Sequence, residues 1–238
     1  MQEDVLLAVH SKDYAYLPQN DLFDILRSGL ETTFSGYEFV EGSYSEELTT
    51  AFLEFPSQKN VIASLGLNDC TPAVLFTTND VGKCGANIQA MLVREDVVNG
   101  IKRKVRVRLG TQLSTTHKDN HTVAEFGANV DNILSILQDG TKKLETLKNI
   151  SIKYPEQCFM NIVKEYNLPK KEGEAAKEDF SIRRPVNVTA YDLYWALWNI
   201  MVYVKANGAS ITRQMDVEEN LTRSLNTTWS KFDVDYAV

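Results

Sequence analysis

Residues 99–109 read Asn-Gly-Ile-Lys-Arg-Lys-Val-Arg-Val-Arg-Leu, and this stretch decides the fold class. The opening Asn-Gly pair is typical of a two-residue β-hairpin turn, because both residues tolerate the positive φ that such a turn requires. Charged and apolar residues then alternate, as they do along a strand whose side chains point to opposite faces. We therefore expect an antiparallel hairpin in which Lys104, Arg106 and Arg108 share one face and the apolar residues between them enter a core.

A row of basic side chains on one strand favours phosphate binding, because guanidinium and ammonium groups are common partners of nucleic-acid backbones. Lys102 and Arg103 extend the row toward the turn. We therefore predict a nucleic-acid-binding set that consists of Lys102, Arg103, Lys104, Arg106 and Arg108. The competing interpretation is the solvated outer face of a half-buried sheet, which would bind no ligand.

The charge of the chain is unevenly distributed. The 238 residues carry a net charge of −7, which argues against a general coat for nucleic acid. The net charge is −10 over residues 1–100, +5 over residues 101–154 and −2 over the remainder. A local positive field can therefore exist around the basic strand of an otherwise acidic protein.

Hydrophobic periodicity and turn residues divide the chain into a β-rich part and a later helical part. We expect strands at residues 5–9, 37–40, 48–55, 73–77, 88–94 and 102–109, and helices at residues 18–30, 122–148, 155–166, 189–208 and 217–232. Thr122 and Thr189 each begin a capping-box pattern. The order of elements predicts an α+β fold, with a curved antiparallel sheet, a long helix packed across it and C-terminal helices.

The expected domain boundaries follow from one polar segment. Residues 168–185 are charged and carry little apolar surface, so we interpret them as a linker. They would separate an α+β core domain at residues 1–167 from a C-terminal helical extension at residues 186–238 that packs on the core. In the extension, Trp195 and Trp198 offer more aromatic surface than one helix stripe needs, which suggests an oligomer contact.

The sequence also bears on the compartment. No window approaches the length of an apolar membrane span, and the acidic start Met1-Gln2-Glu3-Asp4 is unlike a signal peptide. The three cysteines, Cys70, Cys84 and Cys158, are odd in number and irregularly spaced, so we expect no disulfide framework. These features predict reduced thiols and a location in the cytoplasm of a host cell.

Patterns for catalysis and metal binding are weak. His117 and His121 have i, i+4 spacing, but the sequence lacks closely spaced ligand pairs such as Cys-x-x-Cys. Asp69 and Asp80 could bind a metal if the fold brought them together. No nucleophile elbow, P-loop or dinucleotide fingerprint occurs. We therefore predict a protein with no enzymatic activity, no cofactor and no bound metal.

Five segments follow one another in a familiar order, namely Tyr14–Pro18, Ala73–Gly82, Thr116–Lys118, Asp192–Leu197 and Thr212–Asn226. Together they resemble a phage- and plasmid-encoded family, domain of unknown function 932, over residues 14–229. The chain departs from the family's pattern in the turn at Asn79, which lacks the family's histidine, and in the strand at residues 87–93. The resemblance implies a mobile-element origin and no established catalytic chemistry. The family's β-rich core and long helix are also similar in fold to phage single-strand annealing proteins.

These observations favour a phage or plasmid accessory protein that binds nucleic acid, in particular single-stranded DNA, by neutralising its backbone. We expect a homo-oligomer, because a ring or filament would multiply the small basic surface. The acidic overall charge favours an alternative, a protein-interaction module such as a virion component or an inhibitor of a host defence protein. A third alternative is an enzyme whose site is assembled from dispersed carboxylates and histidines.

We predict that the purified protein contains no stoichiometric zinc, because its histidines and cysteines lack the close ligand spacing of zinc sites. Elemental analysis of protein purified without added metal measures this directly. Near-stoichiometric zinc would contradict the prediction and would place His117, His121 and the cysteines at a metal centre.

Overall fold

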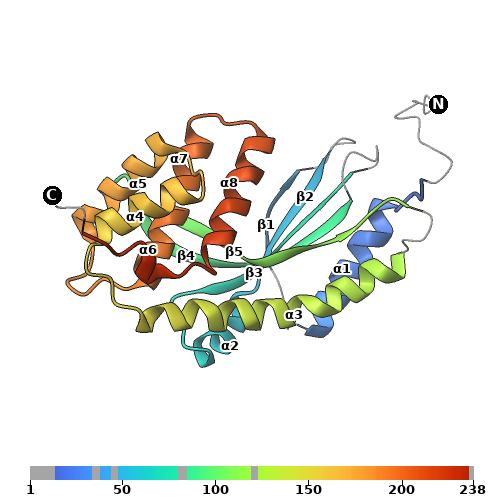
Figure 1. Ribbon diagram of the computed structural model, residues 1–238. Coiled ribbons are helices and arrows are strands. Elements are labelled where there is room, and N and C mark those ends of the chain that lie inside the picture. The colour runs from blue at the N-terminus through green and yellow to red at the C-terminus, as the bar shows by residue number, and fades with distance from the viewer. Residues whose placement is uncertain (1–13, 34–37, 44–47, 80–84, 119–122, 236–238) are drawn as a thin grey trace. The chain divides into compact units, whose positions relative to one another are not determined.

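The computed structural model describes residues 14–33, 38–43, 48–79, 85–118 and 123–235, and it has the α+β fold that the sequence predicts (Figure 1). The strands are β1 (Glu38–Ser43), β2 (Thr49–Glu54), β3 (Thr71–Thr78), β4 (Ala86–Val98) and β5 (Ile101–Thr115). The α-helices are α1 (Gln19–Thr33), α2 (Lys59–Ser64), α3 (Val123–Thr146), α4 (Pro155–Glu165), α5 (Lys170–Arg183), α6 (Ala190–Trp198), α7 (Ile200–Ala206) and α8 (Ile211–Ser224). Within these ranges, no helix combines the length and the apolar character needed to span a bilayer.

The strands form one open sheet in the order β1-β2-β3-β4-β5. Strand β2 pairs antiparallel with both β1 and β3, and the register of β1 shifts between Phe39 and Glu41. Asn99 and Gly100 have φ angles of 50° and 72°, so the hairpin turn predicted between β4 and β5 is confirmed. The strand predicted at residues 5–9 and the helix cap predicted at Thr122 lie outside the described residues.

The chain divides into two compact units that are discontinuous in sequence. The first unit consists of Met1–Ser64, Thr71–Leu92 and Leu109–Gln138, and the second of Leu65–Cys70, Val93–Arg108 and Asp139–Val238. Strands β4 and β5 and helix α3 each continue from the first unit into the second. The division therefore differs from the two consecutive domains that the sequence predicts.

In the first unit, α1 lies beside the N-terminal part of α3 (Figure 1). A Cβ atom on Gly29 of α1 would lie only 2.5 Å from Val130 Cγ1 of α3, so a glycine is needed where the two helices approach. The ring of Phe126 on α3 meets Phe76 of β3 edge to face, with 5.7 Å between the ring centroids. This contact confirms that the long helix packs on the sheet.

Residues 168–185 are not a linker, because α5 occupies most of them. Lysine and glutamate are good helix formers, and Lys170 and Glu174 pair at 3.8 Å one turn apart. Three residues on one side of the helix are buried, namely Gly173, Ala176 and Phe180. This narrow buried stripe is enough to fix a helix that composition alone predicts to be a linker.

The predicted oligomer contact at Trp195 and Trp198 is wrong, because both side chains lie inside the chain, 0% and 1% exposed. They belong to α6, which begins with the capping box predicted at Thr189. Thr189 Oγ1 accepts a hydrogen bond from the backbone N–H of Asp192, whose carboxylate accepts one from the backbone N–H of Thr189. The aromatic surplus therefore fills the core of the second unit.

We predict that Val107→Ala destabilises the fold, because Val107 on β5 is fully buried. Loss of its buried methyl groups should lower the free energy of unfolding by about 1–3 kcal/mol. Chemical denaturation measures this change. The control is Lys102→Ala on the same strand, where the side chain is exposed and the change should stay within about 0.5 kcal/mol. Equal effects of the two substitutions would contradict the assigned strand orientation.

Candidate nucleic-acid interface

The burial of β5 follows the predicted alternation. Val105, Val107 and Leu109 are buried, while Lys102, Arg103 and Lys104 are exposed. Arg106 and Arg108 are half-buried. The five predicted binding residues therefore lie on one strand, but only those next to the turn are fully at the surface.

Helix α8 supplies negative charge near the inner two arginines. Burial lowers the pKa of the Arg108 guanidinium, and the nearby carboxylates of Glu218 and Glu219 partly offset this effect. Burial raises the pKa of the Glu218 carboxyl, and Lys205, Arg108 and Arg106 oppose that shift. The three basic residues predicted to share a face therefore differ in surroundings, because Lys104 is exposed while Arg106 and Arg108 are half-buried near the carboxylates of α8.

The hairpin turn is held by a carboxylate from α5. The backbone N–H of Asn99 donates to Asp179 Oδ2 at 2.8 Å, and the hydroxyl of Tyr203 on α7 donates to the same oxygen. Burial and the neighbouring carboxylate raise the pKa of Tyr203, so the phenol stays protonated and keeps donating. The start of β5 therefore has a fixed position within the second unit.

Arg94 on β4 organises the same unit. Its guanidinium group lies 4.3 Å from the ring centroid of Trp195 and 5.6 Å from that of Tyr191. It also pairs with Asp69 and Asp96, at 3.5 Å each. Asp69, which the sequence suggests as a metal ligand, therefore serves Arg94, and its suggested partner Asp80 lies outside the described residues. No local pattern in the sequence points to this cluster.

Three of the cysteine and histidine candidates, Cys70, Cys158 and His117, are buried, and Cys84 lies outside the described residues. Burial raises the pKa of the Cys70 and Cys158 thiols to about 12, so both stay protonated near neutral pH. His117 is buried and stacks on Tyr14, with 5.0 Å between the ring centroids. His121 lies outside the described residues, and within the described ranges no three His, Cys, Asp or Glu side chains gather as metal ligands would.

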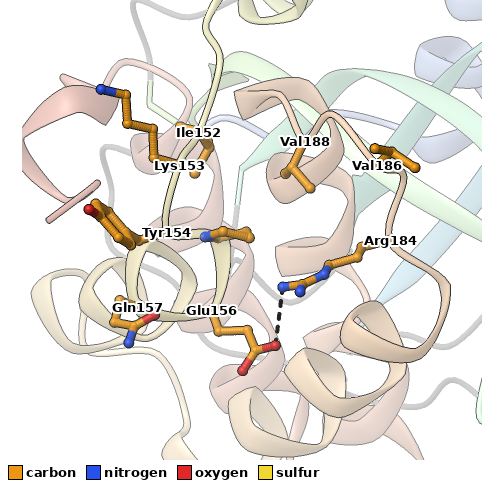
Figure 2. A pocket seen from close by; sticks show the side chains of 9 residues that line it. Ile152, Lys153, Tyr154, Glu156, Gln157, Arg184, Val186 and Val188 are labelled. Carbon is orange, nitrogen blue, oxygen red and sulfur yellow. Dashed lines mark hydrogen bonds and ion pairs between the residues drawn. The ribbon is translucent and has the colours of Figure 1, made fainter. Parts of the chain in front are cut away.

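A cavity with a volume of about 350 Å³ lies in the second unit where α4 begins (Figure 2). Arg184, which follows α5, points toward Glu156 of α4 and pairs with it at 3.2 Å (Figure 2). Asp233 accepts hydrogen bonds from the backbone N–H groups of Lys153 and Tyr154 at its edge. The guanidinium group of Arg184 in this cavity is thus balanced by a carboxylate.

No family model matches the chain, and no curated protein or solved structure matches it. The resemblance to domain of unknown function 932 therefore stays a prediction, as does the absence of enzymatic activity.

We predict that the two buried thiols resist modification in the folded chain. Their raised pKa values and their burial leave almost no reactive thiolate at pH 8. A thiol assay on the Cys84→Ser variant, which removes the cysteine outside the described residues, should detect no fast reaction until denaturant is added. Both remaining thiols should then react. Rapid labelling of Cys70 or Cys158 under native conditions would contradict their burial.

Proposed function

We propose that this chain is a phage or plasmid accessory protein that binds single-stranded nucleic acid through the start of β5. The observation that carries the proposal is the exposure of three consecutive basic side chains, Lys102, Arg103 and Lys104. They stand on a strand whose next residues alternate between buried valines and half-buried arginines. The buried valines fix the strand, and its exposed cationic end can then contact phosphates.

The position of these cations is set before any ligand arrives. Asp179 holds the turn at Asn99, and residues two apart on a strand project from one face at roughly 6.6 Å spacing. Lys102 and Lys104 can therefore approach separate phosphates, with Arg106 behind them. Preorganisation of this kind reduces the entropy lost on binding.

The surrounding negative charge favours a single strand over a duplex. A flexible single strand can follow a short cationic row and turn its other phosphates away from the acidic surface. A stiff duplex would bring many phosphates near that surface at once. Three or four contacts bind weakly, so we propose that several copies act together and raise the affinity through multivalency.

One observation favours a second candidate function, a protein-interaction module. Ile182 and Val186 are 81% and 101% exposed, and Val186 stands at the rim of the cavity in Figure 2. Exposed aliphatic side chains beside a cavity are typical of surfaces that bind another protein. This candidate and the nucleic-acid proposal use different residues, so substitutions can separate them.

We predict that the triple variant Lys102→Ser, Arg103→Ser, Lys104→Ser loses most binding of a fluorescent thymidine oligonucleotide of about 12 nucleotides. Each lost phosphate contact should remove roughly 0.7 from the slope of log affinity against log salt, so loss of the Lys102 and Lys104 contacts should lower the slope by about 1.4. Fluorescence anisotropy over a salt series measures both quantities. Folding should be unaffected, because the three side chains are exposed.

The matched control is Lys142→Ser, Lys143→Ser, Lys171→Ser, which removes the same charge from exposed positions on α3 and α5. It should keep the affinity and the salt slope of the parent within about twofold, because it leaves the β5 contacts in place. An equal loss in both variants would mean that net charge, not this strand, controls binding. If the parent shows no salt-sensitive binding, the nucleic-acid proposal fails and the protein-interaction candidate becomes the better one.

A further inference from the structure

A second cavity, of about 170 Å³, lies in the second unit and includes Asp179, the residue that anchors the hairpin turn. Its apolar walls come from α5 and α6, through Phe180 and Ala196. Its polar groups are Arg94, Asp96, Asp179, Arg183, Asp192 and Asn199. The volume exceeds that of one water molecule several times over, and it suits a small planar ligand better than a drug-sized one.

Asn199 is the group that marks this cavity as a binding site. Its side chain is 2% exposed, and its Nδ2 donates to Asp96 Oδ2 at 3.2 Å. Its Oδ1 is buried and accepts no hydrogen bond from any described residue. Buried carbonyl oxygens are rarely left without a donor, so this acceptor calls for a ligand or water in the cavity. Flipping the amide by 180° would place Oδ1 against the Asp96 carboxylate, where neither group can donate a hydrogen bond. The flip therefore does not satisfy the carbonyl oxygen.

The other polar groups divide into satisfied and open ones. Asp96 accepts from Asn199 and the Val97 N–H and pairs with Arg94, while Asp179 accepts from Asn99 and Tyr203. The hydrogen bonds of Asp192 run through Oδ2, and no described residue donates to its Oδ1.

Arg183 lies on the same cavity wall, and its Nε donates to the backbone carbonyl of Asp179 at 3.2 Å. Its terminal nitrogens lie 4.0 Å from the carboxylates of Asp96 and Asp179, beyond hydrogen-bond distance. Among the residues that line the cavity, the open groups are thus two acceptors, Asn199 Oδ1 and Asp192 Oδ1, and one donor group, the terminal nitrogens of Arg183.

We propose that this cavity takes a guanine base from a bound single strand. Guanine carries two adjacent N–H donors, on N1 and the 2-amino group, beside the carbonyl acceptor O6. In number and kind, these groups match the two open acceptors and the open terminal nitrogens of Arg183. On their Watson–Crick edges, adenine, cytosine and thymine each have only one nitrogen that donates. Each of these bases would therefore leave one acceptor of the cavity without a donor.

The base and the phosphate of a bound nucleotide would occupy different parts of the protein because of the charges there. The three carboxylates of the cavity repel a phosphate group but admit a neutral base, while the phosphates stay with the lysines of β5. Lys102 is three residues beyond Asn99, roughly 10 Å along the strand, and Asn99 is bonded to the cavity residue Asp179. The inference therefore rests on the proposed function and adds a base preference to it.

The experiment compares three oligonucleotides of about 12 nucleotides by anisotropy at one salt concentration. One contains thymidine alone, and each of the other two carries a single central guanosine or inosine. A single guanosine per strand avoids the guanine runs that form quadruplexes. The parent should bind the guanosine oligonucleotide about tenfold more tightly than the thymidine one. Inosine lacks the 2-amino group, so its oligonucleotide should fall between them. This comparison needs no variant that could fail to fold.

Two variants then test the cavity itself. Asn199→Leu, a near match in size, should bring the guanosine-to-thymidine ratio to about one. Arg183→Gln, at an exposed position on α5, should lower the same ratio several-fold without touching the core. Asn187→Leu, in the exposed segment before α6, is the matched control and should keep the parent's ratio.

The outcomes separate the two proposals. Equal affinity of the parent for all three oligonucleotides overturns the guanine site and leaves the strand interface standing. A guanosine preference that survives both Asn199→Leu and Arg183→Gln also overturns it, because the preference then arises elsewhere. Loss of all oligonucleotide binding by the parent overturns the proposed function, and the base site falls with it.

Discussion

The guanidinium group of Arg94 joins the parts of the second unit on which the candidate site depends. It contacts the rings of Trp195 and Tyr191 on α6 and pairs with Asp69, which precedes β3, and with Asp96 on its own strand. A cation placed over aromatic rings and withdrawn from water gains about 2 kcal/mol or more. Burying the guanidinium group would be costly without the two carboxylates that neutralise its charge. The aromatic contacts of Arg94 therefore depend on its ion pairs.

This arrangement fixes β4, and through the two-residue turn it fixes β5. Asp96 is held by Arg94 and in turn accepts a hydrogen bond from Asn199 between α6 and α7. Asp179 then ties the turn at Asn99 to α5 and α7. The exposed basic residues therefore stand on a strand that is fastened at its turn and at its core side. Their value as a binding surface comes from this fastening as much as from their charge.

Local patterns in the sequence predicted the hairpin, and the reason is physical. Asn99 and Gly100 fix the turn by their own backbone preferences, and the alternation after them fixes which side chains enter the core. Similar local signals placed α1, α4 and the Thr189 capping box. Helix α5 was missed because its buried stripe is so narrow that its composition is that of a solvated segment.

The burial and the charged neighbours of each basic residue depend on contacts between distant parts of the sequence, which no local pattern predicts. Glu218 lies more than a hundred residues after Arg108 in the sequence. It belongs to α8, whose polar residues have the sequence pattern of a solvent-exposed helix face. The fold brings its carboxylate into the field of Arg108 and Arg106. Asn199 likewise interrupts an apolar stripe that reads as one helix, and its unmet carbonyl oxygen becomes visible only when the cavity around it is known.

The distribution of carboxylates explains how a chain with a net charge of −7 can hold a specific cationic surface. Helix α8 balances the inner arginines of β5, Glu156 balances Arg184, and Asp179 and Asp96 stand close to Arg183. On β5, exposed positive charge is thereby limited to the few residues after the hairpin turn. A field confined in this way gives little attraction to nucleic acid at large, because non-specific affinity grows with the number of phosphates neutralised. Selectivity in such a protein must then come from groups that read something other than charge. In our proposal, Asn199 Oδ1 and the other open polar atoms of the cavity that includes Asp179 supply that selectivity.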